Sequence, residues 1–311
     1  MKAKLPNNLL AIPVAGIDFI EFSTHDKETV TCQLETFGFS PIAHHHREDV
    51  TIYQQNDIRI VVNRAAQSLA EQHSDMYGFS VSAIGLLVPD AKMAYQQALE
   101  HAVLPYDAND LFMCDVYGVP AIYALGNSLI YFVDYQKEKP NYAVCFSHLP
   151  SSNPEGIGLT GIDHMTYAVR EETLEDWRNY YARLFNFNKV KINLKTTSFY
   201  NSYQEDYLNI LENEGVEHIA FNSENMPQSI KLLWDRGVEY FVDLSHAANV
   251  KDICCLAKKN DMQPKSLQIF APTRVGSLFF ELVQHDHVET VTNEVRALTD
   301  MRRLAIPEKN V

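Results

Sequence analysis

Three polar residues, His164, His218 and Glu281, interrupt segments that are otherwise apolar. Their surroundings read IDHMTY, VEHIAF and FFELV, patterns that are typical of buried β-strands. A carboxylate inside such a strand is costly unless it is paired or bound to a metal. Two imidazoles and one carboxylate are the ligand set of non-haem iron(II) sites, which keep coordination positions open. The same ligand set also occurs in catalytic zinc sites.

The placement of the three residues argues against one zinc class. Zincins carry two histidines one turn apart in an HExxH helix, and the sequence has no such motif. All three candidates are instead predicted on strands. We therefore predict one metal site per chain, formed by His164, His218 and Glu281, whose ligand set suits Fe(II) and also occurs with catalytic zinc. The alternative is that they are polar core residues whose hydrogen bonds are satisfied without a metal.

An internal duplication supports the metal site. Three segments of the first half align in order with three of the second: 16–19 (GIDF) with 161–164 (GIDH), 81–84 (VSAI) with 216–219 (VEHI), and 128–132 (SLIYF) with 277–281 (SLFFE). The first copy has Phe19, Ala83 and Phe132 where the second has the three candidate ligands. Polar residues at matched positions of one copy favour a site in the second half.

The elements that must position these residues follow the same order in both halves. Apolar periodicity and turn residues predict, in the first half, strands at 16–24, 50–53, 58–62, 79–88, 119–124 and 128–134 and helices at 27–38, 65–75 and 90–100. In the second half they predict strands at 161–169, 188–194, 198–203, 216–222, 267–270 and 278–284, helices at 174–185, 227–236 and 288–304, and an insertion at 242–264. A strand–helix–strands unit is therefore used twice in each half.

Length and composition bound the organisation of the chain. Its 311 residues are enough for two domains, and the Pro- and Gly-rich residues 136–158 are predicted as a linker between domains at 1–135 and 159–311. A net charge of −14 argues against a nucleic-acid partner. No apolar run is long enough to span a membrane, and no secretory signal is evident. Five cysteines without a CxxC pair are typical of a reducing compartment, so we expect a cytoplasmic protein.

Several segments together resemble the 4-hydroxyphenylpyruvate dioxygenase family of the vicinal oxygen chelate superfamily. In the second half the resemblance is carried by the triad and by LQIF at 267–270 ahead of LFFE at 278–281. In the first half it is carried by DVTIYQQ at 49–55 and NSLIYFVDY at 127–135. The similarity extends from about residue 8 to residue 285.

The resemblance implies an α+β fold of duplicated βαβββ modules that form two open barrels, with the metal only in the C-terminal one. It implies an Fe(II) enzyme whose partners are a 2-oxo acid and O₂. The expected reaction converts 4-hydroxyphenylpyruvate into homogentisate and CO₂ in tyrosine catabolism. His164, His218 and Glu281 match the family's metal ligands. Gln268 matches the catalytic amide that contacts the substrate near the metal, and Phe270 matches an aromatic residue against the substrate ring.

The chain departs from the family pattern at Glu217, at residues 204–206 and after residue 285, where a Gly- and Phe-rich lid is missing. The predicted helix 288–304 offers an aliphatic face instead, which predicts weaker affinity for 4-hydroxyphenylpyruvate.

Three classes of function remain: an Fe(II) oxygenase of a 2-oxo acid, including a hydroxymandelate-forming one; a non-oxygenase metalloenzyme of the superfamily, such as a lyase or isomerase; and a binding protein that keeps the fold. The substrate and the oligomeric state do not follow from the sequence, which is compatible with a homo-oligomer.

Two other clusters are interpreted as lacking a metal role. His44, His45 and His46 precede RED at 47–49 and are predicted to lie in a solvated polar turn. Cys254 and Cys255 are adjacent in the sequence and are assigned to the insertion, because neighbouring thiols rarely ligate one ion together.

Overall fold

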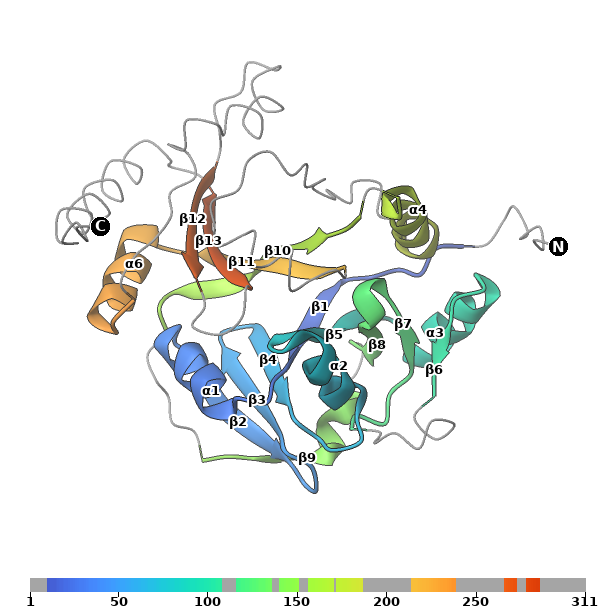
Figure 1. Cartoon of the computed structure of the whole chain (residues 1–311), viewed down its shortest axis with the longest axis horizontal. Helices are drawn as coiled ribbons and strands as arrows, with labels where there is room; N and C mark the ends of the chain where they lie inside the picture. Colours follow the sequence, from blue (N-terminus) through green and yellow to red (C-terminus); the bar gives the residue numbers. More distant parts are fainter. Residues whose placement is uncertain are drawn as a thin grey trace, which may run out of the picture.

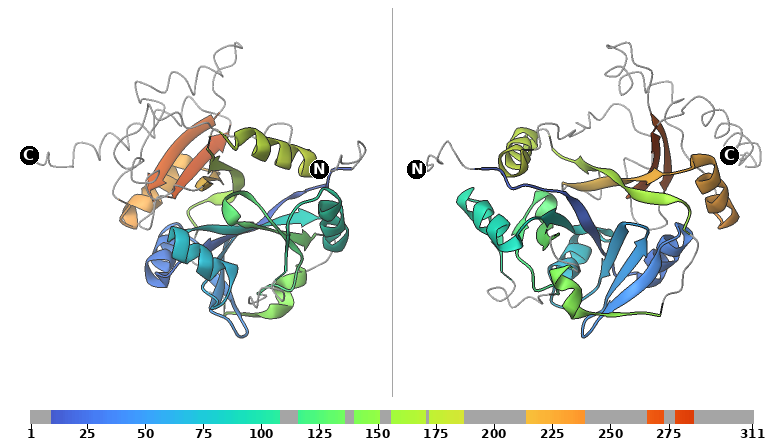
Figure 2. Two further views of the ribbon diagram at one scale, coloured as in Figure 1. Left: turned by 45° about the vertical axis from the view of Figure 1, so that its right-hand side comes forward. Right: turned by 180° about the vertical axis from the view of Figure 1, so that it is seen from behind.

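The computed structural model describes residues 10–107, 116–135, 140–150, 156–170, 172–186, 214–238, 266–272 and 278–285. The first half of the chain, blue to green in Figure 1, lies against the strands of the second half, and Figure 2 shows the same contact from two other sides. The predicted elements at 188–194, 198–203 and 288–304, the insertion 242–264 with its two cysteines and residues 204–206 lie outside the described residues. No helix in the described ranges is long and apolar enough to cross a membrane.

The first half forms one mixed sheet with the strand order β6-β7-β8-β5-β1-β4-β3-β2-β9. Its elements up to the middle of the half are β1 (Gly16–Ser23), α1 (Lys27–Thr36), β2 (Ser40–His45), β3 (Val50–Gln55), β4 (Ile58–Asn63) and α2 (Leu69–Tyr77). They are followed by β5 (Ser80–Val88), α3 (Ala91–Glu100), β6 (Pro105–Tyr106), β7 (Ala121–Tyr123), η1 (Leu125–Asn127) and β8 (Leu129–Asp134). Strand β1 pairs parallel with β4 and β5 pairs parallel with β8, so the half contains two units of one strand, one helix and three strands.

The second half forms a four-stranded sheet with the order β10-β11-β13-β12. Its described elements are β10 (Leu159–Ala168), α4 (Leu174–Phe185), β11 (Gly215–Ser223), α6 (Met226–Asp235), β12 (Ser266–Pro272) and β13 (Phe279–His285). Strand β11 pairs antiparallel with β10 and parallel with β13, as β5 does with β1 and β8. The fold is therefore α+β with mixed sheets. The predicted arrangement of two open barrels also involves the strands expected at 188–194 and 198–203, which lie outside the described residues.

Side-chain caps explain where the helices begin. Asp26, Ser68, Asp90 and Asn225 each accept a hydrogen bond from the backbone N–H three residues later, at the starts of α1, α2, α3 and α6. Such caps satisfy backbone donors that the helix itself leaves unpaired. The cap at Ser68 also explains why α2 begins at Leu69, four residues later than the predicted start at residue 65.

The interpretation of the histidine tract as a solvated turn is wrong for two of its three residues. Strand β2 includes His44, which pairs with Thr51 of β3, and His45, because β9 (Phe146–His148) pairs with residues 43–45. A short helix, η2 (Asn141–Cys145), precedes β9. Residues 140–150, inside the segment predicted as a linker, thus extend the sheet of the first half. No local pattern reveals a pairing between segments about a hundred residues apart.

The two halves share one hydrophobic core. Phe280 on β13 packs against Phe22 and Phe37 of the first half, with ring centroids 6.2 Å and 4.9 Å apart. Phe39 lies 5.8 Å from Phe221 on β11. All five rings are fully buried in a single cluster that contains residues of both sheets. A second cluster, around Phe19 and Tyr117, belongs to the first half alone.

A buried histidine in α2 makes the stability of the first half depend on pH. His73 is 5% exposed. Its Nε2 lies 3.3 Å from the Gly126 carbonyl, which can only accept, so Nε2 carries the hydrogen and Nδ1 accepts from the Ser80 hydroxyl at 2.8 Å. Burial lowers the pKa of His73 from 6.5 to about 4. The folded protein therefore holds His73 neutral over a pH range in which the unfolded chain protonates it.

We expect the free energy of unfolding to fall as the pH decreases from 6.5 to about 4, since the unfolded chain alone gains a proton at His73 in this window. The contribution of His73 to this fall is about 3 kcal/mol. Urea denaturation between pH 7 and pH 4 measures it. His73→Gln keeps one acceptor and one donor but takes up no proton, so its pH profile should be flatter than that of the wild type. Parallel profiles for the two proteins would contradict this assignment.

Candidate metal site

Three neighbouring strands of the second sheet each contribute one polar side chain to a common point. His164 lies on β10, His218 on β11 and Glu281 on β13. In the ladder, Ala220 of β11 pairs with both His164 and Glu281. Successive residues of a strand point to opposite faces of its sheet. Phe280 and Leu282 enter the shared core, so Glu281 between them points to the other face.

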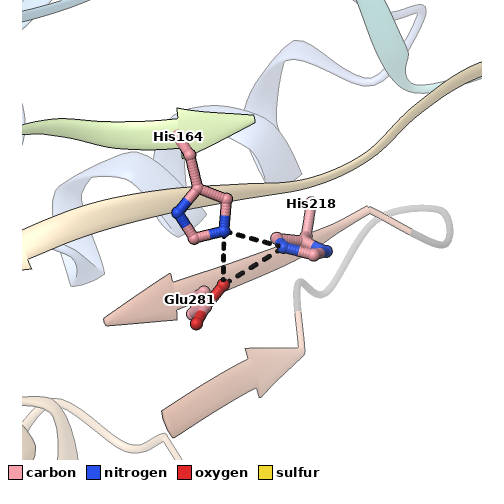
Figure 3. A group of neighbouring side chains, drawn as sticks. All are labelled: His164, His218 and Glu281. Carbon is pink, nitrogen blue, oxygen red and sulfur yellow. Dashed lines mark hydrogen bonds and ion pairs between the residues drawn. The ribbon is translucent and has the colours of Figure 1, made fainter. Parts of the chain in front are cut away.

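The three side chains form a small triangle. Figure 3 shows the Nε2 atoms of both imidazoles and one carboxylate oxygen directed toward one another. Glu281 Oε2 lies 3.3 Å from His164 Nε2 and 3.1 Å from His218 Nε2, and the two Nε2 atoms are 3.4 Å apart. The structure thus brings together all three residues that the sequence predicted as ligands.

Burial differs strongly among the three residues. The side chain of Glu281 is 1% exposed, that of His218 is 11% exposed, and that of His164 is 38% exposed. Burial alone would raise the pKa of the Glu281 carboxyl, but hydrogen bonds from His164 and His218 outweigh it and hold the pKa below its usual value. The bond to Glu281 also raises the pKa of His164 against the effect of burial. The site therefore holds a buried carboxylate between two imidazoles and is open on the side of His164.

The donor set and its spacing fit a metal ion. Metal–ligand bonds of about 2.1 Å at right angles place neighbouring ligand atoms roughly 3 Å apart, close to the sides of the observed triangle. Glu281 Oε1 is buried and has no hydrogen-bond partner within the described part of the chain. A buried carboxylate that is only half satisfied is costly, and a cation bound among the three side chains would compensate it. The triangle can therefore hold a divalent metal.

Further residues contact the triangle from outside. The Nδ1 atom of His164 lies 2.7 Å from Asp163 Oδ2, and Nε2 of His285 lies 2.6 Å from Asp163 Oδ1. The Thr166 hydroxyl lies 2.9 Å from His218 Nε2. The sequence prediction missed Asp163 and His285. The sequence did contain an indication that Asp163 matters, because Asp18 occupies the matched position in an equally apolar strand of the first half.

The two residues predicted to contact substrate lie on the neighbouring strand β12. Gln268 pairs with Val283 in the backbone ladder, and Phe270 pairs with Glu281. Both therefore belong to the strand next to the one that carries a candidate ligand. Their side chains are outside the described part of the structure, so their predicted contacts with substrate stay predictions.

Comparison with known sequences gives concordant matches to one family. A family model described as hydroxyphenylpyruvate dioxygenase, N-terminal, matches residues 9–147. A 4-hydroxyphenylpyruvate dioxygenase from Legionella pneumophila (strain Corby) is 31% identical over 318 aligned residues, which cover 86% of this chain and 88% of that protein.

Comparison with solved structures supports the fold over nearly the whole chain. A fusion protein of a xylose isomerase-like TIM barrel and a 4-hydroxyphenylpyruvate dioxygenase matches with a TM-score of 0.70 at 21% identity, covering 97% of this chain and 55% of that one. A variant of 4-hydroxymandelate synthase from Streptomyces coelicolor matches with a TM-score of 0.64 at 17% identity, covering 92% of this chain and 99% of that one.

Proposed function

Because the chain belongs to the 4-hydroxyphenylpyruvate dioxygenase family, a family of dioxygenase enzymes, we propose that it is an Fe(II)-dependent dioxygenase of a 2-oxo acid. The leading substrate is 4-hydroxyphenylpyruvate, and the expected product is homogentisate. The observation that carries the proposal is the triangle of His164, His218 and Glu281, whose sides measure 3.1–3.4 Å. A polar core with all hydrogen bonds satisfied does not account for the buried Oε1 of Glu281, which has no hydrogen-bond partner among the described residues.

In this proposal His164, His218 and Glu281 hold the iron, which supplies open positions for the 2-oxo acid and O₂ and the electrons that oxygen activation requires. Glu281 contributes the negative charge of the site. Asp163 can only accept a hydrogen bond when ionised, so the Nδ1 of His164 carries a hydrogen, and its Nε2, which donates to Glu281 in the metal-free site, would offer its lone pair to the iron. Gln268 and Phe270 are proposed to bind the substrate from β12, as the family resemblance implies.

The fold proposal completes the second half as a copy of the first. Its four described strands pair in the order of β1, β5, β8 and β7, which supports a second open barrel. The further strands predicted at 188–194 and 198–203 lie outside the described residues. We retain 1–135 and 159–311 as the two domains and 136–158 as the segment between them, of which residues 140–150 extend the sheet of the first half. The net charge of −14 favours small-molecule partners over a nucleic acid. The five cysteines without a CxxC pair favour a cytoplasmic protein.

The reaction is tested with an oxygen electrode and a panel of aromatic and aliphatic 2-oxo acids. Protein loaded anaerobically with Fe(II) is expected to consume one O₂ for each CO₂ released, with 4-hydroxyphenylpyruvate the best substrate. Pre-incubation with a strong iron chelator should stop the uptake, and added Fe(II) should restore it. Oxygen uptake that is unaffected by the chelator would contradict the iron assignment.

The product decides between the leading reaction and its alternative. Conversion of 4-hydroxyphenylpyruvate to homogentisate and to 4-hydroxymandelate has the same balance, because each consumes one O₂ and releases one CO₂. Chromatography of the quenched reaction separates the two products. Homogentisate supports the proposed reaction, whereas hydroxymandelate supports the activity named for the similar Streptomyces enzyme. Metal-dependent turnover without oxygen uptake would favour a lyase or isomerase.

A further inference from the structure

A β-bulge lies directly before the first candidate metal ligand. In the β10–β11 ladder, Ile162 pairs with Phe221 and His164 pairs with Ala220, so two steps along β10 oppose one step along β11. Asp163 is the extra residue. Bulges of this kind change the direction of side chains and are frequent beside active sites.

The bulge brings two adjacent side chains to the same face of the sheet. Neighbouring residues of a regular strand point to opposite faces. In β10, Ile162, Met165 and Tyr167 pack on the shared core, with a spacing of three residues and then two. Asp163 and His164 therefore both point away from that core. Only this arrangement allows the 2.7 Å contact between Asp163 Oδ2 and His164 Nδ1.

The second carboxylate oxygen of Asp163 is held by another strand. Asp163 Oδ1 lies 2.6 Å from Nε2 of His285, the last residue of β13. Strand β13 also carries Glu281, and β11 lies between β10 and β13. The contact thus links the outer two ligand-bearing strands across the central one. The side chain of Asp163 is 21% exposed and that of His285 is 52% exposed, so His285 is the more solvent-exposed partner of this contact.

The first half shows the same bulge with different partners. Ile17 pairs with Leu86 and Phe19 with Gly85, so Asp18 is the extra residue there. Asp18 receives hydrogen bonds from Arg59 and from the Tyr142 hydroxyl. The residue after it is Phe19, which offers no hydrogen-bond donor in its side chain. A bulged aspartate is thus a feature of both copies, and in the second copy its donors are imidazoles.

We propose that Asp163 is a positioning residue for the metal site: it accepts the Nδ1 hydrogen of His164 and so presents the Nε2 lone pair to the metal, while His285 holds Asp163 in place. The inference rests on the proposed function only in requiring that the triangle bind a metal. A carboxylate behind a ligating histidine fixes its tautomer and orientation and increases its basicity, and removal of such a group costs about 10–100-fold in metal affinity.

The test measures Co(II) binding to metal-free protein by calorimetry and by visible absorption, which reports ligand geometry without turnover. Asp163→Asn keeps the size of the side chain but loses its charge and one acceptor oxygen. It is expected to weaken Co(II) binding by about 10–100-fold and to change the absorption bands. Asp18→Asn, the matched variant in the first half, should leave both measurements unchanged. Melting temperatures of the metal-free proteins report whether each variant folds.

His285→Gln provides a variant at a half-exposed position, where loss of the fold is not expected. It should weaken Co(II) binding less than Asp163→Asn, and adding it to Asp163→Asn should have little further effect, since His285 acts through Asp163. Co(II) affinity and spectrum equal to those of the wild type in folded Asp163→Asn would overturn the inference alone. A wild-type chain that binds no Co(II) would overturn the proposed function and this inference with it.

Discussion

Replacing Glu281 with glutamine is expected to abolish iron retention and oxygen uptake while the protein stays folded. Glu281 supplies the negative charge of the triangle, and without it two imidazoles remain as ligands. Loss of a residue that only hydrogen-bonds to a metal ligand already costs about 10–100-fold in metal affinity. Loss of the ligand itself should therefore cost more. Iron content after dialysis and the oxygen electrode measure the two effects. His164→Ala should lose activity in the same way.

The stability of the metal-free Glu281→Gln variant shows whether lost activity comes from the loss of a metal ligand or from the loss of the fold. Glu281 is 1% exposed, and one of its oxygens has no partner in the described residues. Because Glu281 Oε2 lies 3.3 Å from His164 Nε2 and 3.1 Å from His218 Nε2, its removal should lower the melting temperature of metal-free protein without unfolding it. The control is Glu21→Gln, because the buried carboxylate of Glu21 is bonded by Asn63, Ser82 and Tyr117. That change should cost about 1–3 kcal/mol of unfolding free energy and leave iron binding intact. Iron retention in folded Glu281→Gln equal to that of the wild type would contradict a metal role for Glu281.

Phe280→Ala is expected to reduce the free energy of unfolding by about 3–5 kcal/mol, the usual cost of truncating a buried aromatic ring. The ring of Phe280 is fully buried and packs on Phe22 and Phe37 of the first half. Its removal leaves a cavity between the halves rather than within one of them. Urea denaturation followed by fluorescence and by circular dichroism measures the loss.

Phe279→Ala is the matched control, since Phe279 is the preceding residue on the same strand and is only partly buried. Its effect on stability should be clearly smaller. A loss below about 1 kcal/mol for Phe280→Ala, far under the usual range, would show that the contact between the halves contributes little to stability.

The sequence alone predicted the parts of the fold that local patterns determine. Strand β11 and helix α6 are close to the predicted ranges 216–222 and 227–236 because apolar periodicity and turn residues act over a few neighbours. The candidate ligands followed from comparing the two copies, since Phe19, Ala83 and Phe132 show that the strands themselves do not require polar residues.

The parts that the sequence did not reveal depend on register between distant segments. The extension of β2 through His45 requires its pairing with β9. The role of Asp163 requires a bulge, because in a regular strand its side chain would point into the shared core. The partner His285 becomes visible only when β13 is placed two strands from β10. Such features follow from pairing geometry, which composition and periodicity do not encode.

The shared core has a consequence for the biosynthesis of the protein. During translation, the first half emerges from the ribosome before the segments that contain Phe221 and Phe280 have been synthesised. At usual elongation rates of roughly 5–20 residues per second, the rings of Phe22, Phe37 and Phe39 stay without their packing partners for on the order of tens of seconds. During this interval the nascent chain presents an aromatic surface that favours aggregation or chaperone binding. A stalled or truncated product that ends before β11 is therefore expected to be insoluble, although its own sheet is complete.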